Sequence, residues 1–398
     1  MVRTGTLEPA GGGRSGPQRD GRTEVRHGFA LWVRDPVASA VAFHLLTRLA
    51  TLAAIGIAAG RQGTSFADAV TRHDGRWFER VAMTGYPSPL PEVAARVVTN
   101  ESAFFPLFPL LVRPLVLLGV PFWLGAVLEV LIFSTVTSAL IVLCVRRYAS
   151  DRVALLTSCC WSVFPTASVL SVAYSEALFS LTVAACLLFL LRRSWLAAGV
   201  AAALGGATRP TGLVLVAALG VVVLVALVRD RDRRSLLALA IAPLGTLAAL
   251  GGIGLATGRM DAWFVTQREG WGVYFDGGVS FVRWVWDSAV NRESPVRIAF
   301  VVAVVGCLAL VVLALLRRPP LPVALVLAAG TILAVGQGGE FYLSPLRFLL
   351  PFFPLLVPAA EWLSGRKPLL RAVVLAGLGV IAVAGGVYYF AATGGASP

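Results

Sequence analysis

The chain has 398 residues, of which 57% are hydrophobic and 14% are charged, and its mean hydropathy is +0.80. Soluble domains carry about 25% charged residues, so this composition excludes an ordinary soluble protein and indicates an integral membrane protein. The formal net charge of +13 does not indicate nucleic-acid binding. Most of the basic residues lie in the N-terminal tail and in short clusters between apolar runs, which is the positive-inside pattern of membrane insertion.

The apolar runs do not alternate with polar residues as the strands of a membrane barrel would, so the predicted fold class is an all-α polytopic membrane protein. The sequence has 33 arginines and one lysine, a bias typical of high-GC bacteria, and we expect a bacterial cell membrane. All five cysteines lie inside apolar runs, and neither they nor the three histidines have metal-ligand spacing. We therefore predict no cofactor and no metal ligands, and leave open whether a divalent metal assists.

The domain organisation follows from the order of these runs. Residues 1–35 are rich in Gly and Arg, and we expect a disordered cytoplasmic tail. The first apolar run starts near Pro36, too late and too long for a cleaved signal peptide. One transmembrane domain is predicted over 36–392, followed by a short C-terminal tail at 393–398.

The arginine clusters predict the topology. Placing every cluster between apolar runs on the cytoplasmic side gives about eleven helices, with the N-terminus inside and the C-terminus outside. The predicted helices cover 36–60, 122–145, 153–172, 176–192, 195–208, 211–228, 235–257, 296–316, 321–338, 346–364 and 369–391.

Two long loops, 61–121 and 258–295, then lie on the extracytoplasmic side. In this threading the proline-rich segment 104–120 stays on the outer face as an interfacial or re-entrant piece. The alternative is that it crosses the membrane, which would place the next arginine pair outside. The apolar spans themselves are expected to be nearly featureless near the bilayer midplane.

Asp74 is the most informative residue of the first loop. A carboxylate at the bilayer edge can accept a proton from a sugar hydroxyl or coordinate a metal, and the alternative is a solvated loop acid beside interfacial aromatic residues. We assign its neighbours His73, Arg76 and Trp77, and also Glu101, to a substrate site.

Further polar residues lie at the outer ends of the apolar runs. Tyr174 and Glu176 bridge two runs, where an acid is costly and usually functional; the alternative, which the motif by itself favours, is a helix cap. Arg209 and Arg347 lie on the outer side against the positive-inside trend. Each suits a donor phosphate, which a guanidinium can grip with two hydrogen bonds; the alternatives are an ion pair with Glu176 for Arg209 and snorkelling for Arg347.

Gln267 and Trp271 are the candidate binding residues of the second loop. An amide and an indole can bind the hydroxyls and the apolar face of a sugar. The alternative is an amphipathic helix at the interface.

The order of these motifs resembles the PIG-V-like mannosyltransferases, a branch of the GT-C glycosyltransferases. The resemblance runs from about 36 to 365. It is carried by 73–78 with Gly85 and Tyr86, by 103–110, 174–179 and 208–212, by Gln267 with 270–272, and by 347–348 before Pro351. His73 stands where the family commonly has Trp, and Phe78 where it commonly has Tyr.

The resemblance implies a GT-C-like helical bundle whose large first extracytoplasmic loop carries interfacial helices. It also implies inverting transfer of mannose from a polyprenyl-phosphate donor to a lipid or cell-envelope glycan acceptor, with Asp74 as the catalytic base. The alternative functions are a transporter or flippase of a lipid-linked or small polar substrate, and a non-catalytic assembly subunit. A transporter is expected to carry internal repeats and broken helices with polar residues near the midplane.

Overall fold

The computed structural model describes residues 35–290, 295–339 and 344–392. The predicted N-terminal and C-terminal tails, apart from Asp35, lie outside these ranges. The described chain from Pro36 onward forms one unit. It is built from helices, and the described strands are four of two residues each. The prediction of an all-α polytopic bundle is confirmed.

Six helices within the described ranges are long and apolar enough to cross a membrane. They cover Pro36–Arg61 (α2), Phe122–Val145 (α6), Pro210–Asp230 (ending in α10, Leu213–Asp230), Arg233–Thr257 (containing α11, Leu236–Ile241, and α12, Leu244–Thr257), Arg297–Leu316 (within α15, Pro295–Leu316) and Pro368–Ala391 (α19, Pro368–Gly386, and the π turn η8, Val387–Ala391). Three shorter apolar helices continue the bundle: Glu176–Leu191 (α8), Trp195–Thr208 (α9) and Leu321–Val335 (α16).

Two predicted helices are not continuous, and those two predictions are wrong. The first splits into α7 (Asp151–Ser162) and a 3-10 turn η2 (Ala167–Ser171). The second splits into α17 (Pro345–Leu349), a 3-10 turn η7 (Phe353–Leu356) and α18 (Val357–Ser364). Prolines at each break, such as Pro165 and Pro351, lack the N–H that a helix interior needs.

The break after α7 explains a polar group that the sequence reading overlooked in α2. The fully buried guanidinium of Arg48 donates hydrogen bonds to the carbonyl oxygens of Ala167 and of Ser162, the latter at 2.6 Å. The Nδ1 atom of His44 forms a hydrogen bond with the Ser162 hydroxyl at 3.0 Å. Carbonyl groups released by a broken helix need such partners inside a membrane, so these spans are not featureless.

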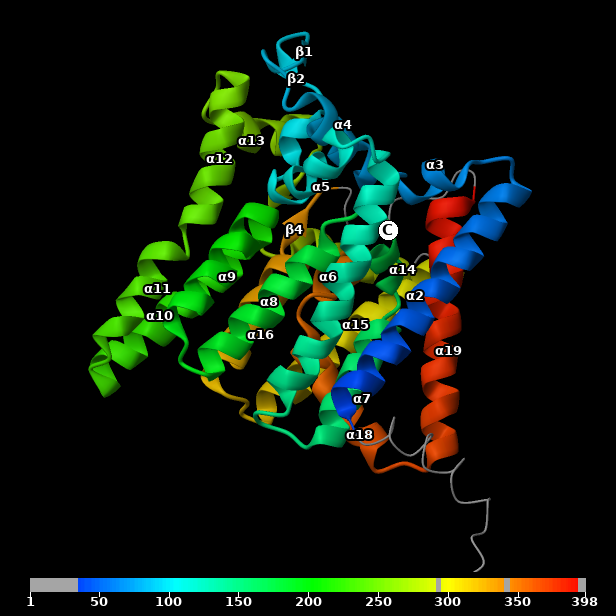
Figure 1. Cartoon of the computed structure of the whole chain (residues 1–398), viewed down its shortest axis with the longest axis vertical. Helices are drawn as coiled ribbons and strands as arrows, with labels where there is room; N and C mark the ends of the chain where they lie inside the picture. Colours follow the sequence, from blue (N-terminus) through cyan, green and yellow to red (C-terminus); the bar gives the residue numbers. More distant parts are fainter. Residues whose placement is uncertain (1–34, 291–294, 340–343, 393–398) are drawn as a thin grey trace, which may run out of the picture. The chain divides into compact units, whose positions relative to one another are not determined.

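The first loop and the second loop gather at one end of the bundle, the upper end in Figure 1. This end holds α3 (Phe66–Val70), α4 (Asp74–Thr84), α5 (Leu107–Leu117) and α13 (Ala262–Val265). Helix α5 has 11 residues and spans about 16 Å, half of a bilayer core. Its length supports the interfacial reading of segment 104–120.

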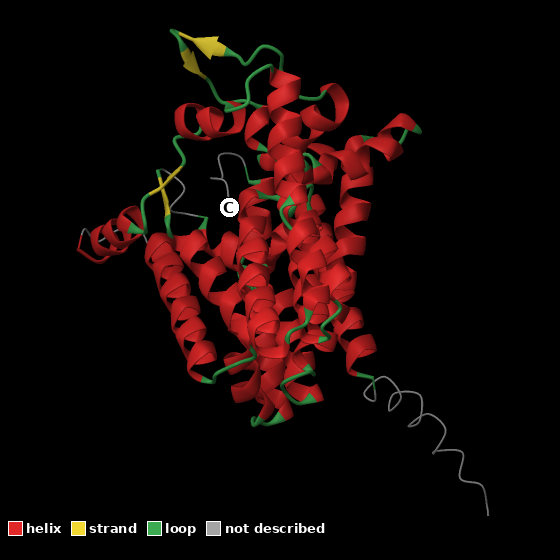
Figure 2. Ribbon diagram, turned by 90° about the vertical axis from the view of Figure 1, so that its left-hand side faces the viewer, coloured by secondary structure: helices red, strands yellow, loops and turns green. Residues whose placement is uncertain are grey.

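Two short antiparallel strand pairs involve these loops and are drawn in yellow in Figure 2. Strands β1 (Glu92–Val93) and β2 (Arg96–Val97) form a hairpin in the first loop. Strand β3 (Tyr274–Phe275), which precedes α14 (Val279–Val290), pairs with β4 (Gln337–Gly338). The second pair joins the second loop to the turn that leads towards α17.

Glycines bring α9 close to its neighbours. A Cβ at Gly199 would lie 2.8 Å from the Cα of Ala238 in α11, and one at Gly205 would lie 3.0 Å from the Thr182 hydroxyl in α8. Small residues permit such close backbone approach where helices pack in a membrane. Because α8 starts at Glu176 and α9 ends at Thr208, this packing also sets where Glu176 and Arg209 lie.

Candidate active site

Asp74 is the first residue of α4, where the helix dipole favours a carboxylate. The start of this helix is pressed against the turn before α8. A Cβ at Gly75 would lie 3.2 Å from the Ala173 carbonyl oxygen, and the Ala173 N–H donates to the Val70 carbonyl at 2.9 Å. The first loop is therefore docked on the segment that carries Tyr174 and Glu176.

Four charged side chains from four segments meet at this docking point, and we call Asp74, Glu176, Arg209 and Arg347 the charge cluster. The Arg347 guanidinium donates to Asp74 Oδ2 at 2.7 Å, and its Nε lies 3.4 Å from Glu176 Oε1. Arg209 Nη1 lies 2.6 Å from the same Glu176 oxygen. Two carboxylates and two guanidinium groups balance, so the cluster is neutral as a whole.

Burial divides the cluster into an inner and an outer part. The Glu176 and Arg347 side chains are 1% and 4% exposed, whereas those of Asp74 and Arg209 are 15% and 14% exposed. A substrate that reaches this site would therefore meet Asp74 and Arg209 first.

Several polar atoms in the inner part lack a hydrogen bond of good geometry within the described chain. They are the Tyr174 hydroxyl, the Arg347 Nε and both oxygens of Glu176. The pairs to Glu176 are thus close charge contacts and not well-aligned hydrogen bonds. Buried polar groups without partners are rare in native proteins, so the two donors, the Tyr174 hydroxyl and the Arg347 Nε, have capacity for a further acceptor, whereas the Glu176 oxygens can only accept.

Aromatic rings surround the two arginines. The Arg347 guanidinium lies 5.4 Å from the ring centre of Tyr174 and 5.2 Å from that of Phe348, and Arg209 lies 5.6 Å from the Phe348 ring. Such contacts stabilise a cation where water is scarce. They also hold the planar guanidinium groups in fixed orientations.

Trp77, assigned to the substrate site from the sequence, belongs to a cluster of aromatic rings. Trp77 follows Asp74 by three residues, so both lie on the same side of α4. Its ring stacks on Phe104 at 6.2 Å with an interplanar angle of 12° and meets Trp271 edge-on at 5.5 Å. The first and second loops therefore share one aromatic cluster beside Asp74.

Two other first-loop candidates stay at the rim. Glu101 pairs with Arg80 at 3.3 Å, and the Arg80 guanidinium lies 4.7 Å from the Trp77 ring. Arg76 is exposed. Neither Glu101 nor Arg76 joins the charge cluster.

Gln267 and Trp271 bind the protein's own backbone. The Gln267 amide donates to the Ala103 carbonyl at 3.0 Å, and the Trp271 indole donates to the Asn100 carbonyl at 3.4 Å. These bonds join the second loop to the first. The side chains assigned to substrate thus also link the two loops.

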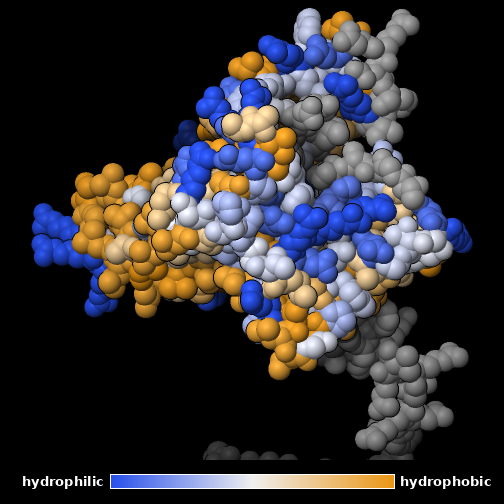
Figure 3. Space-filling view, turned by 90° about the horizontal axis from the view of Figure 1, so that it is seen from above, coloured by the Kyte–Doolittle hydropathy of each residue, from blue (hydrophilic) through white to orange (hydrophobic). Residues whose placement is uncertain are grey.

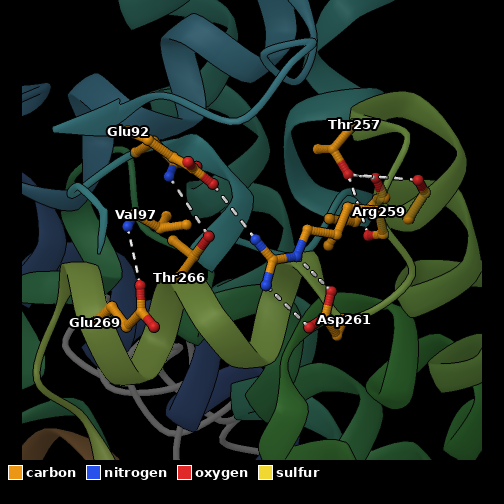
Figure 4. A network of polar contacts seen from close by, with 10 residues as sticks. Glu92, Val97, Thr257, Arg259, Asp261, Thr266 and Glu269 are labelled. Atoms are coloured by element: carbon orange, nitrogen blue, oxygen red, sulfur yellow. Dashed lines mark hydrogen bonds and ion pairs between the residues drawn. The ribbon is translucent and has the colours of Figure 1, made fainter. Parts of the chain in front are cut away.

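Figure 4 shows how a polar network completes this junction between the loops. Arg259 pairs with Asp261 at 2.7 Å and with Glu92 of β1 at 3.4 Å, while the Val97 N–H donates to Glu269 at 2.9 Å. Arg259 and Asp261 are exposed, so their pairing contributes little stability. The network holds the hairpin against the second loop.

His73 and Arg72 attach the Asp74 segment to the C-terminal turn η8. His73 Nε2 donates to the Tyr389 carbonyl at 3.0 Å, and Arg72 Nη1 donates to the Ala392 carbonyl at 2.7 Å. The pKa of His73 is lowered, chiefly by burial, so the neutral ring is favoured. Sequence reasoning missed Arg72 and the C-terminal partners, because nothing local in residues 387–392 indicates where they lie.

His73 also has an unusual backbone conformation, with φ of 59° and ψ of −117°. Glycine is the residue that adopts this region without strain, and other residues there cost about 1–3 kcal/mol. No group of three His, Cys, Asp or Glu side chains within the described residues is arranged to hold a metal ion. The acids of the charge cluster face arginines instead.

An apolar groove of about 670 Å³ runs between α8 and α9. It extends from Trp195 and Phe189 at one end to Leu178 and Leu204 at the other. Leu178 is two residues from Glu176, and Arg209 directly follows the end of α9. The groove therefore ends near the ends of α8 and α9 that carry Glu176 and Arg209, although no residue of the charge cluster lines it.

Comparison with known proteins fits this architecture. Residues 106–253, less than half of the chain, match the family model described as dolichyl-phosphate-mannose-protein mannosyltransferase. Among solved structures, the chain is similar to ArnT from Cupriavidus metallidurans, a structure with bound undecaprenyl phosphate, with a TM-score of 0.51 and 17% sequence identity. The match covers 86% of this chain and 63% of the ArnT chain. No curated protein matches the chain.

The chain shares the ArnT fold. This likeness and the apolar helices support a multi-pass membrane protein. Neither comparison confirms the resemblance to the PIG-V-like mannosyltransferases.

Figure 3 looks down on the end of the bundle that carries the loops. Hydrophilic side chains gather over the middle of this end, while hydrophobic side chains dominate the flank on the left. Exposed leucines of α11 and α12, such as Leu237 and Leu247, belong to the lipid-facing surface. The site thus lies at the polar end of an apolar bundle.

Proposed function

We propose that the protein is a membrane glycosyltransferase that moves a sugar, mannose in our assignment, from polyprenyl phosphate to a hydroxyl group of a lipid or cell-envelope glycan. The reaction inverts the anomeric carbon and takes place on the extracytoplasmic face of a bacterial cell membrane, with the N-terminus in the cytoplasm. The observation that carries the proposal is the charge cluster, in which the partly exposed Asp74 carboxylate lies with two arginines at one end of an apolar helical bundle.

The cluster suits a displacement at the anomeric carbon. The acceptor oxygen attacks this carbon, the bond to the phosphate oxygen breaks, and the acceptor proton passes to Asp74. Prenyl phosphate leaves as an anion that is already stable at neutral pH, so no acid is required opposite the base. This differs from the two carboxylates that glycosidases use.

Arg209 and Arg347 would bind the donor phosphate. Arg347 now donates to Asp74, and both arginines lie near Glu176. Phosphate oxygens would offer the guanidinium groups new acceptors and weaken the bond between Arg347 and Asp74. Donor binding would therefore leave the carboxylate freer to accept a proton.

The groove between α8 and α9 supports a lipid-linked donor. Its walls are almost entirely apolar, and it runs along α8 and α9 towards the helix ends that carry Glu176 and Arg209. A polyprenyl chain could lie along it with the phosphate at the charge cluster. The undecaprenyl phosphate in the similar ArnT structure is consistent with a donor of this class.

The choice of mannose rests on the PIG-V-like motifs and on the mannosyltransferase family model that matches residues 106–253. The stacked rings of Trp77 and Phe104 offer an apolar face near Asp74. Aromatic rings of this kind bind the apolar face of a sugar. Trp77 would contact the transferred sugar or the acceptor.

The second candidate is a transporter or flippase of a lipid-linked substrate. The broken helices α7 and α17 favour it, since transporters build substrate sites from such helices. The polar groups at the α7 break, however, are used to cap one another. The accessible charges lie at the end of the bundle, which favours chemistry there.

The deciding experiment uses purified protein in nanodiscs. Radiolabelled polyprenyl-phosphate mannose is incubated with glycolipid and glycan acceptors, with polyprenyl-phosphate glucose and a nucleotide sugar as control donors. We expect transfer from polyprenyl-phosphate mannose and from neither control donor. NMR of the product should show that the anomeric configuration of the mannose is inverted. Flux of the lipid-linked sugar across proteoliposomes, without transfer to any acceptor, would favour the transporter.

A further inference from the structure

The strained residue of the site directly precedes Asp74. His73 has a positive φ of 59°, although it is neither glycine nor asparagine. Its backbone sets the direction in which α4 starts and therefore where the Asp74 carboxylate points. Strained backbone conformations persist only when surrounding contacts hold them.

The contacts that hold His73 come from the other end of the chain. A carbonyl oxygen only accepts hydrogen bonds, so the bond to Tyr389 requires the His73 tautomer with its proton on Nε2. Arg72 adds a second bond to the Ala392 carbonyl. Both acceptors lie at the end of η8, where helix carbonyls have no partner within the helix.

Packing joins the same segments. Phe390 is fully buried, and its ring centre lies 6.2 Å from that of His73 and 5.5 Å from that of Tyr174. The Tyr174 ring in turn lies beside Arg347. The η8 turn thus contacts both the segment that carries Asp74 and the ring that orients its arginine partner.

We infer that His73 is a positioning residue: its bond to the C-terminal turn η8 fixes the backbone at the start of α4 and therefore the position of the Asp74 carboxylate. The inference rests on the proposed role of Asp74 as the base. A displacement of about 1 Å in a reacting group can lower a rate about a hundredfold. His73 itself makes no contact with the reacting atoms in this assignment.

The test measures kcat and the donor KM of four variants in the mannosyl-transfer assay. His73→Ala removes the bond to Tyr389 and should lower kcat at least tenfold, with the donor KM within twofold of wild type. His73→Gln places an amide N–H near the position of Nε2 and should restore kcat to within threefold. Thr84→Ala, at the far end of α4, is the matched control and should change neither constant.

His73→Asn keeps the inference testable if the alanine variant does not fold. Asparagine tolerates positive φ better than most residues, but its amide is too short to reach Tyr389, so kcat should fall as for alanine. The inference is overturned if His73→Asn has wild-type kcat, if His73→Gln is as slow as His73→Asn, or if the loss lies in the donor KM. A wild-type rate for Asp74→Asn would instead reject the base assignment, so the two failures are separable.

Discussion

Replacing Asp74 by asparagine tests the proposed chemistry most directly. The amide keeps the shape and one acceptor oxygen for Arg347, which now lies 2.7 Å from Asp74 Oδ2, but it cannot take the acceptor proton. Loss of a positioned base typically costs about 10²–10⁴ in rate, or about 3–5 kcal/mol of transition-state stabilisation. We expect a loss of kcat in this range.

The structure also predicts what Asp74→Asn leaves intact. The change raises the charge of the cluster from neutral to +1, with Glu176 still 3.4 Å from Arg347. A phosphate should therefore bind at least as tightly, and the donor KM should stay equal or fall. One weakened hydrogen bond to a charged group costs about 1–3 kcal/mol of folding stability, so a thermal-shift assay should still show a folded protein.

Single-turnover and steady-state transfer assays with the prenyl donor give both constants. Asp68→Asn is the matched control, because Asp68 lies in the same loop, is exposed and belongs to the short helix α3. It should keep wild-type kinetics. A rate for Asp74→Asn within threefold of wild type, together with loss of transfer in Glu176→Gln or Glu101→Gln, would show that the base is another acid.

The remaining predictions concern the phosphate site, the topology and pH. Arg209→Lys and Arg347→Lys keep the charge but lose the planar fork, so the donor KM should rise at least tenfold in each; unchanged donor saturation in both would reject the phosphate assignment. Single cysteines are introduced in a cysteine-free background at Ala95, in the turn of the β1–β2 hairpin, and at Arg234, in the turn between α10 and α11. The hairpin lies at the upper end of the bundle in Figure 1, and α10 and α11 meet towards its lower left. An impermeant maleimide should label only the first in intact cells, and the reverse pattern would invert the topology. Because burial lowers the pKa of His73 below its usual value of about 6.5, the unfolded chain binds a proton that the folded chain does not. Stability should therefore fall as pH decreases from about 7 through 6.5, and over this range the melting temperature of wild type should drop more than that of His73→Gln. If the melting temperatures of the two proteins change with pH in parallel, the prediction is wrong.

The amino-acid sequence by itself determined the class of protein and most of its helices. Long apolar runs such as 122–145 can satisfy their backbone only as helices in a membrane, so their existence follows from composition. The sequence also indicated Asp74, Glu176, Arg209 and Arg347 as unusual, because each is a charge at the edge of an apolar run. It did not show that all four meet.

Only the tertiary structure decided which partners these residues have. Asp74 and Arg347 are 273 positions apart, and their ion pair depends on how α4 docks on the turn before α8. The same holds for Gln267, whose bond to the Ala103 carbonyl links the two loops, a contact that the sequence did not indicate. Local patterns encode a helix because its hydrogen bonds are local. Local patterns could not predict the charge cluster or the C-terminal contact of His73, because those contacts arise from the packing of distant segments.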